Sequence, residues 1–168
     1  MIKRFLTGIL SVASLLLLVS CSATNVKEAN EKVFTSDGMH ITLTEGFKEK
    51  EMEGYTACYD SPEIAVFTLK ETGDNITTMT VLDYAQLVLS ANASKSPKNI
   101  ETIDGIPSME YTYTTETTNV EYQYLTFMYK AADAFWLVQF TCKTEDYEAD
   151  KPYFINWAKT VTFDNVTE

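Results

Sequence analysis

Cations and histidine are scarce in this chain. Its 168 residues contain 13 Lys and Arg against 24 Asp and Glu, together with a single histidine. An acidic surface repels phosphate backbones, so nucleic acid is excluded as a partner. The one imidazole, His40, would have to serve any His-dependent catalytic site, and no G-x-S-x-G motif accompanies it. His40 falls on the polar side of an alternating segment, which predicts a solvent-facing strand residue.

Internal repeats, low-complexity blocks and a second linker are also absent. The length fits one domain that can bury a real core. Apolar residues make up 45% of the chain and aromatic residues 12%, and this composition argues against disorder. The sequence therefore predicts one folded domain behind its N-terminal region.

The longest apolar run covers residues 5–19, about fifteen residues, whereas a spanning helix needs about 20. Two cations precede this run, which is the pattern of a secretory signal. The run ends in four residues that resemble the lipobox of bacterial lipoproteins: Leu18, Val19, Ser20 and Cys21. The resemblance implies cleavage before Cys21, a diacylglycerol on its sulfur, and a lipid-anchored position at the extracytoplasmic face of the cell membrane.

We accordingly divide the chain into a signal peptide (1–20), a lipidated tether (21–32) and a single α+β domain (33–168). The tether segment is small, polar and charged without periodicity, which favours a flexible connection. Removing residues 1–20 removes two cations and no acid, so the net charge of −11 becomes −13. We expect anionic headgroups to repel such a domain.

Alternating apolar residues predict strands, and two segments predict helices. Thr80 and Asp83 form a capping pattern ahead of a buried stripe at helical spacing. A second helix is predicted over Asp150–Ala158, with Pro152 in its first turn. Its predicted buried residues are Phe154, Trp157, Ala158 and Val161. The predicted strands cover residues 33–35, 39–44, 55–60, 63–70, 99–103, 108–114, 120–130 and 134–142.

The strand predicted over 134–142 is apolar on both faces, which indicates the centre of a sheet covered on two sides. The economical arrangement is an antiparallel β-sheet flanked by helices. The order of elements resembles the Mog1/PsbP-like fold through the segments FTSDGMHITLTEGF, TVLDYAQLVLSA, IDGIPSMEY, AFWLVQF and YFINWAKTVTF. The resemblance implies an α/β/α sandwich. In photosynthetic relatives such a domain is an accessory subunit, and others bind small GTPases. The alternative fold is a cystatin-like curved sheet, which usually begins with its main helix.

Two cysteines remain once Cys21 is assigned to the anchor. Cys58 and Cys142 permit a disulfide in an exported protein, and the alternative is two free, buried thiols. A zinc site made from these two and His40 is not favoured, because no pair has ligand-type spacing. The sequence therefore predicts no metal and no cofactor.

Four acids cluster ahead of the last helix: Glu145, Asp146, Glu148 and Asp150. They lack the alternating ligands and central glycine of a calcium loop, and a helix start accounts for them. Five tyrosines lie on neighbouring predicted strands: Tyr111, Tyr113, Tyr122, Tyr124 and Tyr129. They favour either sheet packing or a recognition face.

No catalytic constellation stands out, so the leading hypothesis is a non-enzymatic binding or accessory module. Its partner would be a protein or another component of the cell envelope. One alternative is capture of a small ligand in a pocket between sheet and helix. The other is a hydrolase that uses clustered carboxylates.

Overall fold

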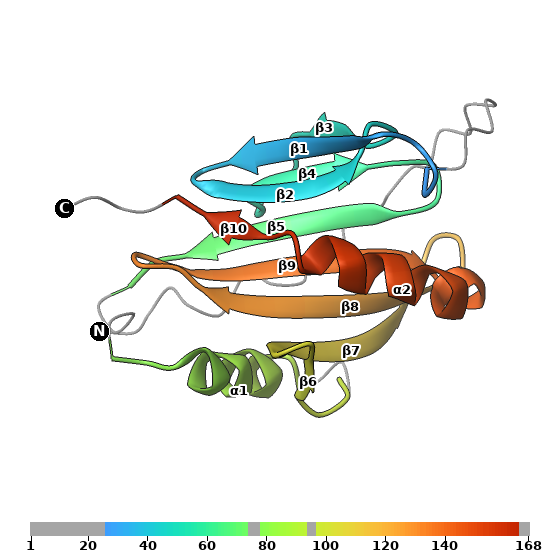
Figure 1. Cartoon of the computed structure of the whole chain (residues 1–168). Coiled ribbons are helices and arrows are strands. Elements are labelled where there is room, and N and C mark those ends of the chain that lie inside the picture. Colours follow the sequence, from blue (N-terminus) through green and yellow to red (C-terminus); the bar gives the residue numbers. More distant parts are fainter. Residues whose placement is uncertain (1–25, 74–77, 94–96, 165–168) are drawn as a thin grey trace.

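The computed structural model describes residues 26–73, 78–93 and 97–164. These residues form two sheets and two helices (Figure 1). The strands are β1 (Glu31–Ser36), β2 (Met39–Thr44), β3 (Lys48–Lys50), β4 (Ala57–Asp60), β5 (Ala65–Glu71), β6 (Glu101–Ile103), β7 (Ile106–Thr114), β8 (Glu121–Lys130), β9 (Phe135–Lys143) and β10 (Thr162–Phe163). The helices are α1 (Val81–Ala91) and α2 (Tyr147–Ala158). Within these ranges, no helix combines the length and apolarity needed to cross a bilayer.

The larger sheet is antiparallel, with the strand order β3-β4-β5-β9-β8-β7-β6. β9 lies at its centre, and every β9 residue except the last is buried. This confirms the prediction made from its apolar residues on both faces. The smaller sheet has the order β1-β2-β10.

The two helices cover opposite faces of the larger sheet. Successive β9 side chains alternate between the faces. Val138 and Phe140 belong to the main core cluster with α2, whereas Phe135 and Leu137 belong to a second cluster with α1. The smaller sheet packs on the same face as α2 and completes the main core. The predicted α+β class with helices on both sides is confirmed.

Helix α1 begins as its sequence predicts. Thr80 Oγ1 accepts a hydrogen bond from the Asp83 amide at 3.1 Å, and Asp83 Oδ2 accepts one from the Thr80 amide at 3.1 Å. Both bonds satisfy amides that a helix start leaves without partners. The inward stripe packs Tyr84 flat on Phe135, with ring centroids 4.4 Å apart. Three strands of the larger sheet and the β1–β2 hairpin precede α1. This order does not fit the cystatin-like alternative.

Helix α2 begins three residues earlier than predicted, at Tyr147. A short 3₁₀ turn over Thr144–Asp146 leads into it, so Pro152 lies in the second turn and not in the first. Because proline has no amide hydrogen, the carbonyl four residues before it loses its helical partner. Phe154, Trp157 and Ala158 are buried as predicted. Val161 lies beyond the helix end and is only partly buried, because the chain turns toward β10 there.

The predicted tether is wrong from residue 26 onward. Val26 is 4% exposed and belongs to the main core, and β1 already begins at Glu31. Val26 lies directly against Gly46, whose missing side chain leaves the space that it fills. A single buried valine in a polar segment produces no periodicity, so composition gave no sign of it. The signal peptide, the lipobox and Cys21 lie outside the described residues.

Candidate functional site

Among the described residues, one half of a sheet face has no helix over it. Helix α1 packs on β7 and β8 and covers the end of the face that contains Met109, Met128, Phe135 and Leu137. Gln139 and Thr141 on β9 point to the same face as Phe135 and Leu137, but they lie beyond the end of α1. Aromatic side chains, and not a helix, occupy this part of the sheet.

We call this surface the tyrosine face and define it by six residues: Tyr55, Phe67, Tyr111, Tyr113, Tyr122 and Tyr124. Four of them form the cross-strand pairs Tyr111–Tyr124 and Tyr113–Tyr122. The Tyr111 and Tyr124 rings stack with centroids 4.7 Å apart at 5°. The Tyr55 and Phe67 rings lie 4.9 Å apart. Tyr111 and Phe67 are buried, and the other four are half-buried.

A buried amide holds the centre of the tyrosine face. Gln139 Nε2 donates to Tyr111 Oη at 2.7 Å and to Thr126 Oγ1 at 2.9 Å. Burial raises the pKa of Tyr124 to about 12 and also raises the pKa of Tyr55. The phenols of these two residues are therefore uncharged at neutral pH. The surface offers ring faces and neutral hydroxyl groups on an otherwise acidic protein.

The fifth predicted tyrosine does not join this face. Tyr129 lies five residues after Tyr124 on β8, and an odd separation along a strand reverses the direction of the side chain. Its ring packs on Phe163, and its hydroxyl donates to the Ala158 carbonyl at 2.8 Å. Tyr129 therefore fastens the end of α2 to the sheet.

A narrow crevice opens beside Tyr55, between the tyrosine face and the α1 end. It has a volume of about 10 Å³ and is lined by Tyr55, Phe67, Leu69, Thr126, Leu137 and Gln139. This volume corresponds to about one water molecule. The crevice is therefore too small for the ligand that the sheet–helix pocket hypothesis requires.

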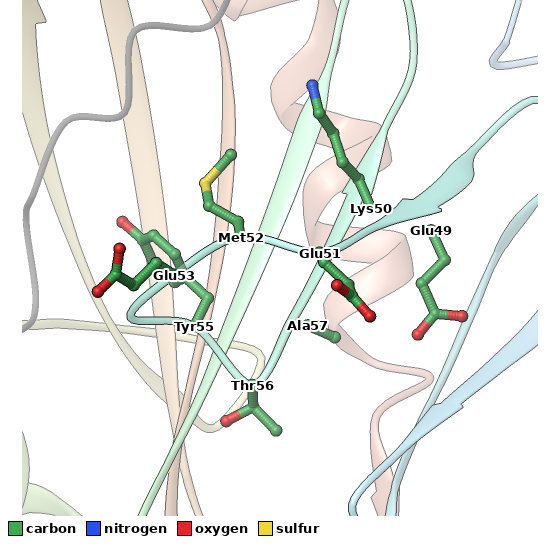
Figure 2. Close-up of a pocket in the computed structure, with 8 residues that line it drawn as sticks. All are labelled: Glu49, Lys50, Glu51, Met52, Glu53, Tyr55, Thr56 and Ala57. Atoms are coloured by element: carbon green, nitrogen blue, oxygen red, sulfur yellow. The ribbon is translucent and has the colours of Figure 1, made fainter.

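A larger, open hollow of about 810 Å³ lies on the β3–β4 hairpin. Figure 2 shows Lys50 and Met52 projecting to one side of the hairpin and Glu49 and Glu51 to the other. Its lining comes from residues 49–57 alone, so one hairpin shapes it and no second element closes it. Tyr55 lines both this hollow and the crevice. The hollow therefore borders the tyrosine face.

His40 forms a chain of contacts with two neighbours. Its Nδ1 lies 2.9 Å from Thr35 Oγ1, and its Nε2 lies 2.7 Å from Asp164 Oδ1. A hydroxyl, an imidazole and a carboxylate in contact are the groups of a nucleophilic triad. Here, however, Thr35 sits in a regular β1–β2 ladder, and the His40 and Asp164 side chains are 31% and 66% exposed. The contacts fasten the chain after β10 to the hairpin, which fits the prediction of a solvent-facing strand residue.

Two of the four clustered acids have different surroundings in the fold. Asp150 is fully buried and forms an ion pair with Lys27. Glu145 is exposed and lies 3.8 Å from Lys143. The described part of the chain contains no group of three or more side chains placed to hold a metal ion. These acids therefore provide no calcium site among the residues described.

Cys58 and Cys142 are buried, free thiols in the structure, so the disulfide alternative is not formed. Cys58 on β4 pairs with Phe67 on β5, which in turn pairs with Gln139 on β9. Cys142 lies three residues after Gln139, so its side chain points to the opposite face of the sheet. Two strand spacings alone span about 9.6 Å, more than the ~7 Å that a disulfide tolerates between α-carbons. Burial raises the pKa of Cys58 to about 11 and raises the pKa of Cys142 as well.

A buried carboxylate that pairs with two lysines was not predicted. Glu110 is buried beneath α2 and accepts bonds from Lys98 Nζ at 2.5 Å, Lys151 Nζ at 2.6 Å and Tyr147 Oη at 2.7 Å. Glu110 occupies the polar half of an alternating segment, which by itself indicates a solvent-facing residue. The docking of α2 brings Lys151 to it, and Lys98 comes from the segment ahead of β6, where its amide also donates to the Glu110 carbonyl at 2.7 Å. It faces away from the tyrosine face and joins α2 to β7.

Comparison with known proteins shows which solved structures have a similar fold. No family model and no curated protein sequence matches this chain. Among solved structures, cyanobacterial PsbP (CyanoP) from Synechocystis has a TM-score of 0.54 at 12% identity, over 88% of this chain and 99% of that one. The fold is PsbP-like.

Two further structures share this fold. A protein from Bacteroides thetaiotaomicron has a TM-score of 0.58 at 12% identity, with 83% of this chain and 50% of that one covered. LpqN of Mycobacterium tuberculosis, described as involved in cell envelope biogenesis, has a TM-score of 0.50 at 9% identity, with 81% and 91% covered. At these identities the likeness shows the architecture alone.

Proposed function

We propose that this protein is a lipid-anchored, extracytoplasmic lipoprotein whose domain acts as a non-enzymatic binding or accessory module. The single observation that carries the binding role is the tyrosine face. It is an aromatic part of a sheet face beside α1, in a domain whose net charge is strongly negative. The anchor is supported by the lipobox resemblance at Cys21.

The chemistry of the tyrosine face suits a protein partner. Tyrosine supplies contact area with few rotatable bonds and a hydroxyl for hydrogen bonding, and it is enriched at interfaces. Tyr113 and Tyr122 are half-buried, so their rings are already held by the sheet before a partner arrives. Such pre-ordering lowers the entropy cost of association. The partner surface is neutral or basic, because an acidic surface would be repelled.

The binding role is tested by photo-crosslinking in cells. A photoreactive amino acid replaces Tyr122 on the tyrosine face or, as the matched control, the 60% exposed Val33 on β1. We expect a discrete crosslinked protein from position 122 that is absent from position 33, and we expect Tyr113→Ala to weaken it. Equal products from both positions, or none from position 122, would contradict the proposed binding face.

The anchor is tested separately. Cys21→Ser should stop processing and release the protein from the membrane fraction, because the thioether carrying two acyl chains cannot form. An unchanged mass and an unchanged membrane fraction would show that the lipobox resemblance is misleading.

A further inference from the structure

The five residues that enter the domain are fixed to it, and we call residues 26–30 the N-terminal clasp. Val26 is buried against Gly46, where a β-carbon would come within 2.7 Å of Val26 Cγ2. The Val26 carbonyl accepts a bond from Thr44 Oγ1 at 2.5 Å. Further along, the Asn30 carbonyl accepts from the Glu45 amide at 2.8 Å. The clasp therefore lies along the end of β2 and the turn that follows it.

A buried ion pair fastens the clasp to α2 as well. Asp150 is fully buried on α2, and its carboxylate pairs with the Lys27 ammonium group, which is itself only 17% exposed. The Lys27 ammonium also lies 5.8 Å from the centre of the Tyr153 ring. Detaching Lys27 would leave a charged carboxylate without its partner inside the protein, which is strongly unfavourable. The clasp is therefore tied to both the smaller sheet and α2.

The clasp shortens the connection to Cys21. Only four residues separate Cys21 from Val26, and the five Cα–Cα steps between these two residues reach at most about 18 Å in any conformation. The predicted tether ended at residue 32 and would have reached about 40 Å. A lipid on Cys21 therefore holds one particular end of the domain near the bilayer.

We infer that the clasp sets which end of the domain faces the membrane; this inference rests on the proposed lipid anchor. The membrane-proximal end contains the turn at Glu45 and Gly46, next to Val26, and the turn after β9 with Glu145. The opposite end contains Asp37 in the β1–β2 turn and Asp133 in the β8–β9 turn. Figure 1 shows the two ends on opposite sides of the sheets. In this orientation the long axes of the strands run from the bilayer outward.

Charge keeps the proximal end from lying flat against the bilayer. The proximal end carries exposed acids such as Glu45 and Glu145, which anionic headgroups repel over roughly one Debye length, about 8 Å. The domain therefore stays away from the bilayer surface, at a distance limited by the length of the chain between Cys21 and Val26. Because the tyrosine face runs along the strands, it points sideways in this orientation. A partner would approach it from within the same layer of the envelope.

Energy transfer to the membrane tests this orientation. A fluorescent amino acid replaces either Glu145, whose side chain is 76% exposed, or the exposed Ala132 at the opposite end. The mature, lipidated protein is reconstituted in vesicles that carry an acceptor on the phospholipid headgroup. The labels are separated by the length of β9, about 27 Å, so we expect at least about twofold higher transfer from position 145. Equal transfer, or higher transfer from position 132, would overturn the inference.

A longer connection provides the control. Inserting twelve Gly and Ser residues between Thr24 and Asn25 leaves the clasp intact but raises the reach to about 60 Å. We expect the two transfer efficiencies to converge in this variant. A difference that persists unchanged would show that the clasp does not act through a short connection.

A chemically attached lipid separates the two proposals. The chain from residue 21 is coupled through the Cys21 thiol to a maleimide phospholipid, a reaction that the buried Cys58 and Cys142 do not share. If the cells do not lipidate Cys21, the proposed anchor fails, yet this preparation still reports the orientation. If lipidation occurs and both preparations give equal transfer, the orientation fails while the anchor stands.

Discussion

Removing the charge of Glu110 should destabilise the domain in a strongly pH-dependent way. Burial alone would raise the pKa of Glu110, but the bonds from Lys151, Lys98 and Tyr147 outweigh it and lower the pKa from 4.5 to about 2. Each pKa unit corresponds to about 1.4 kcal/mol, which gives about 3 kcal/mol. Lys98 is 66% exposed and its share is screened by water, so we expect about 2 to 3 kcal/mol for Glu110→Gln.

The pH dependence follows from the direction of the shift. A carboxyl group whose pKa is lowered in the folded state stabilises that state above its ordinary pKa, and this contribution disappears as the carboxylate is protonated. For Glu110 it should be complete at about pH 7 and be lost between about pH 4.5 and pH 2. Glutamine keeps the shape of the side chain and an oxygen for Tyr147, so the comparison isolates the charge.

Urea unfolding of the two proteins at about pH 7 and pH 3 measures this contribution. The free-energy difference between wild type and Glu110→Gln should shrink by more than half at the lower pH. The control is Glu145→Gln, whose exposed pair with Lys143 should contribute less than about 0.5 kcal/mol at either pH. A Glu110 difference below about 0.5 kcal/mol at pH 7, or one that is equal at both pH values, would refute the reasoning.

Three further predictions concern stability and packing. Gly46→Ala should cost about 1 to 3 kcal/mol in urea unfolding, because its β-carbon would collide with Val26, and adding Val26→Ala should cost less than the sum of the single changes. Thr80→Ala should cost about 1 kcal/mol by the same measurement, since it removes the cap of α1, and a loss near zero would count against the capping box. A thiol reagent near neutral pH should leave Cys58 and Cys142 unreacted in the folded protein and titrate both in denaturant, because burial raises their pKa values and blocks access. Rapid modification of either thiol in the folded protein would contradict this packing.

Orientation and surface chemistry together describe one mode of action. In the proposed orientation, the clasp would hold the proximal end near the bilayer, and the tyrosine face would run parallel to the membrane normal and face sideways. A partner anchored in the same membrane would meet this face at high effective concentration, because both molecules are confined to one layer. A modest intrinsic affinity would then suffice for an accessory subunit.

Local patterns in the sequence determined both helices and most strands, whereas the short strands β3 and β10 were not predicted. The capping pair Thr80 and Asp83 places the start of α1 because the two residues bond to each other within one turn. The doubly apolar run of β9 identifies the central strand, because only a strand covered on both faces can bury every side chain. The order of such elements was sufficient to indicate the PsbP-like architecture. The predicted lipobox at Cys21 is likewise read from a local motif.

Tertiary structure alone decided which residues meet. Asp150 looks like one of several acids at a helix start, and it becomes a buried partner of Lys27 only when the N-terminal segment crosses α2. Val26 looks like part of a tether until Gly46 leaves room for it. Cys58 and Cys142 stay apart because strand order and side-chain alternation put them on opposite faces. Such contacts depend on residues distant in the chain, and no local pattern records which partner the fold will supply.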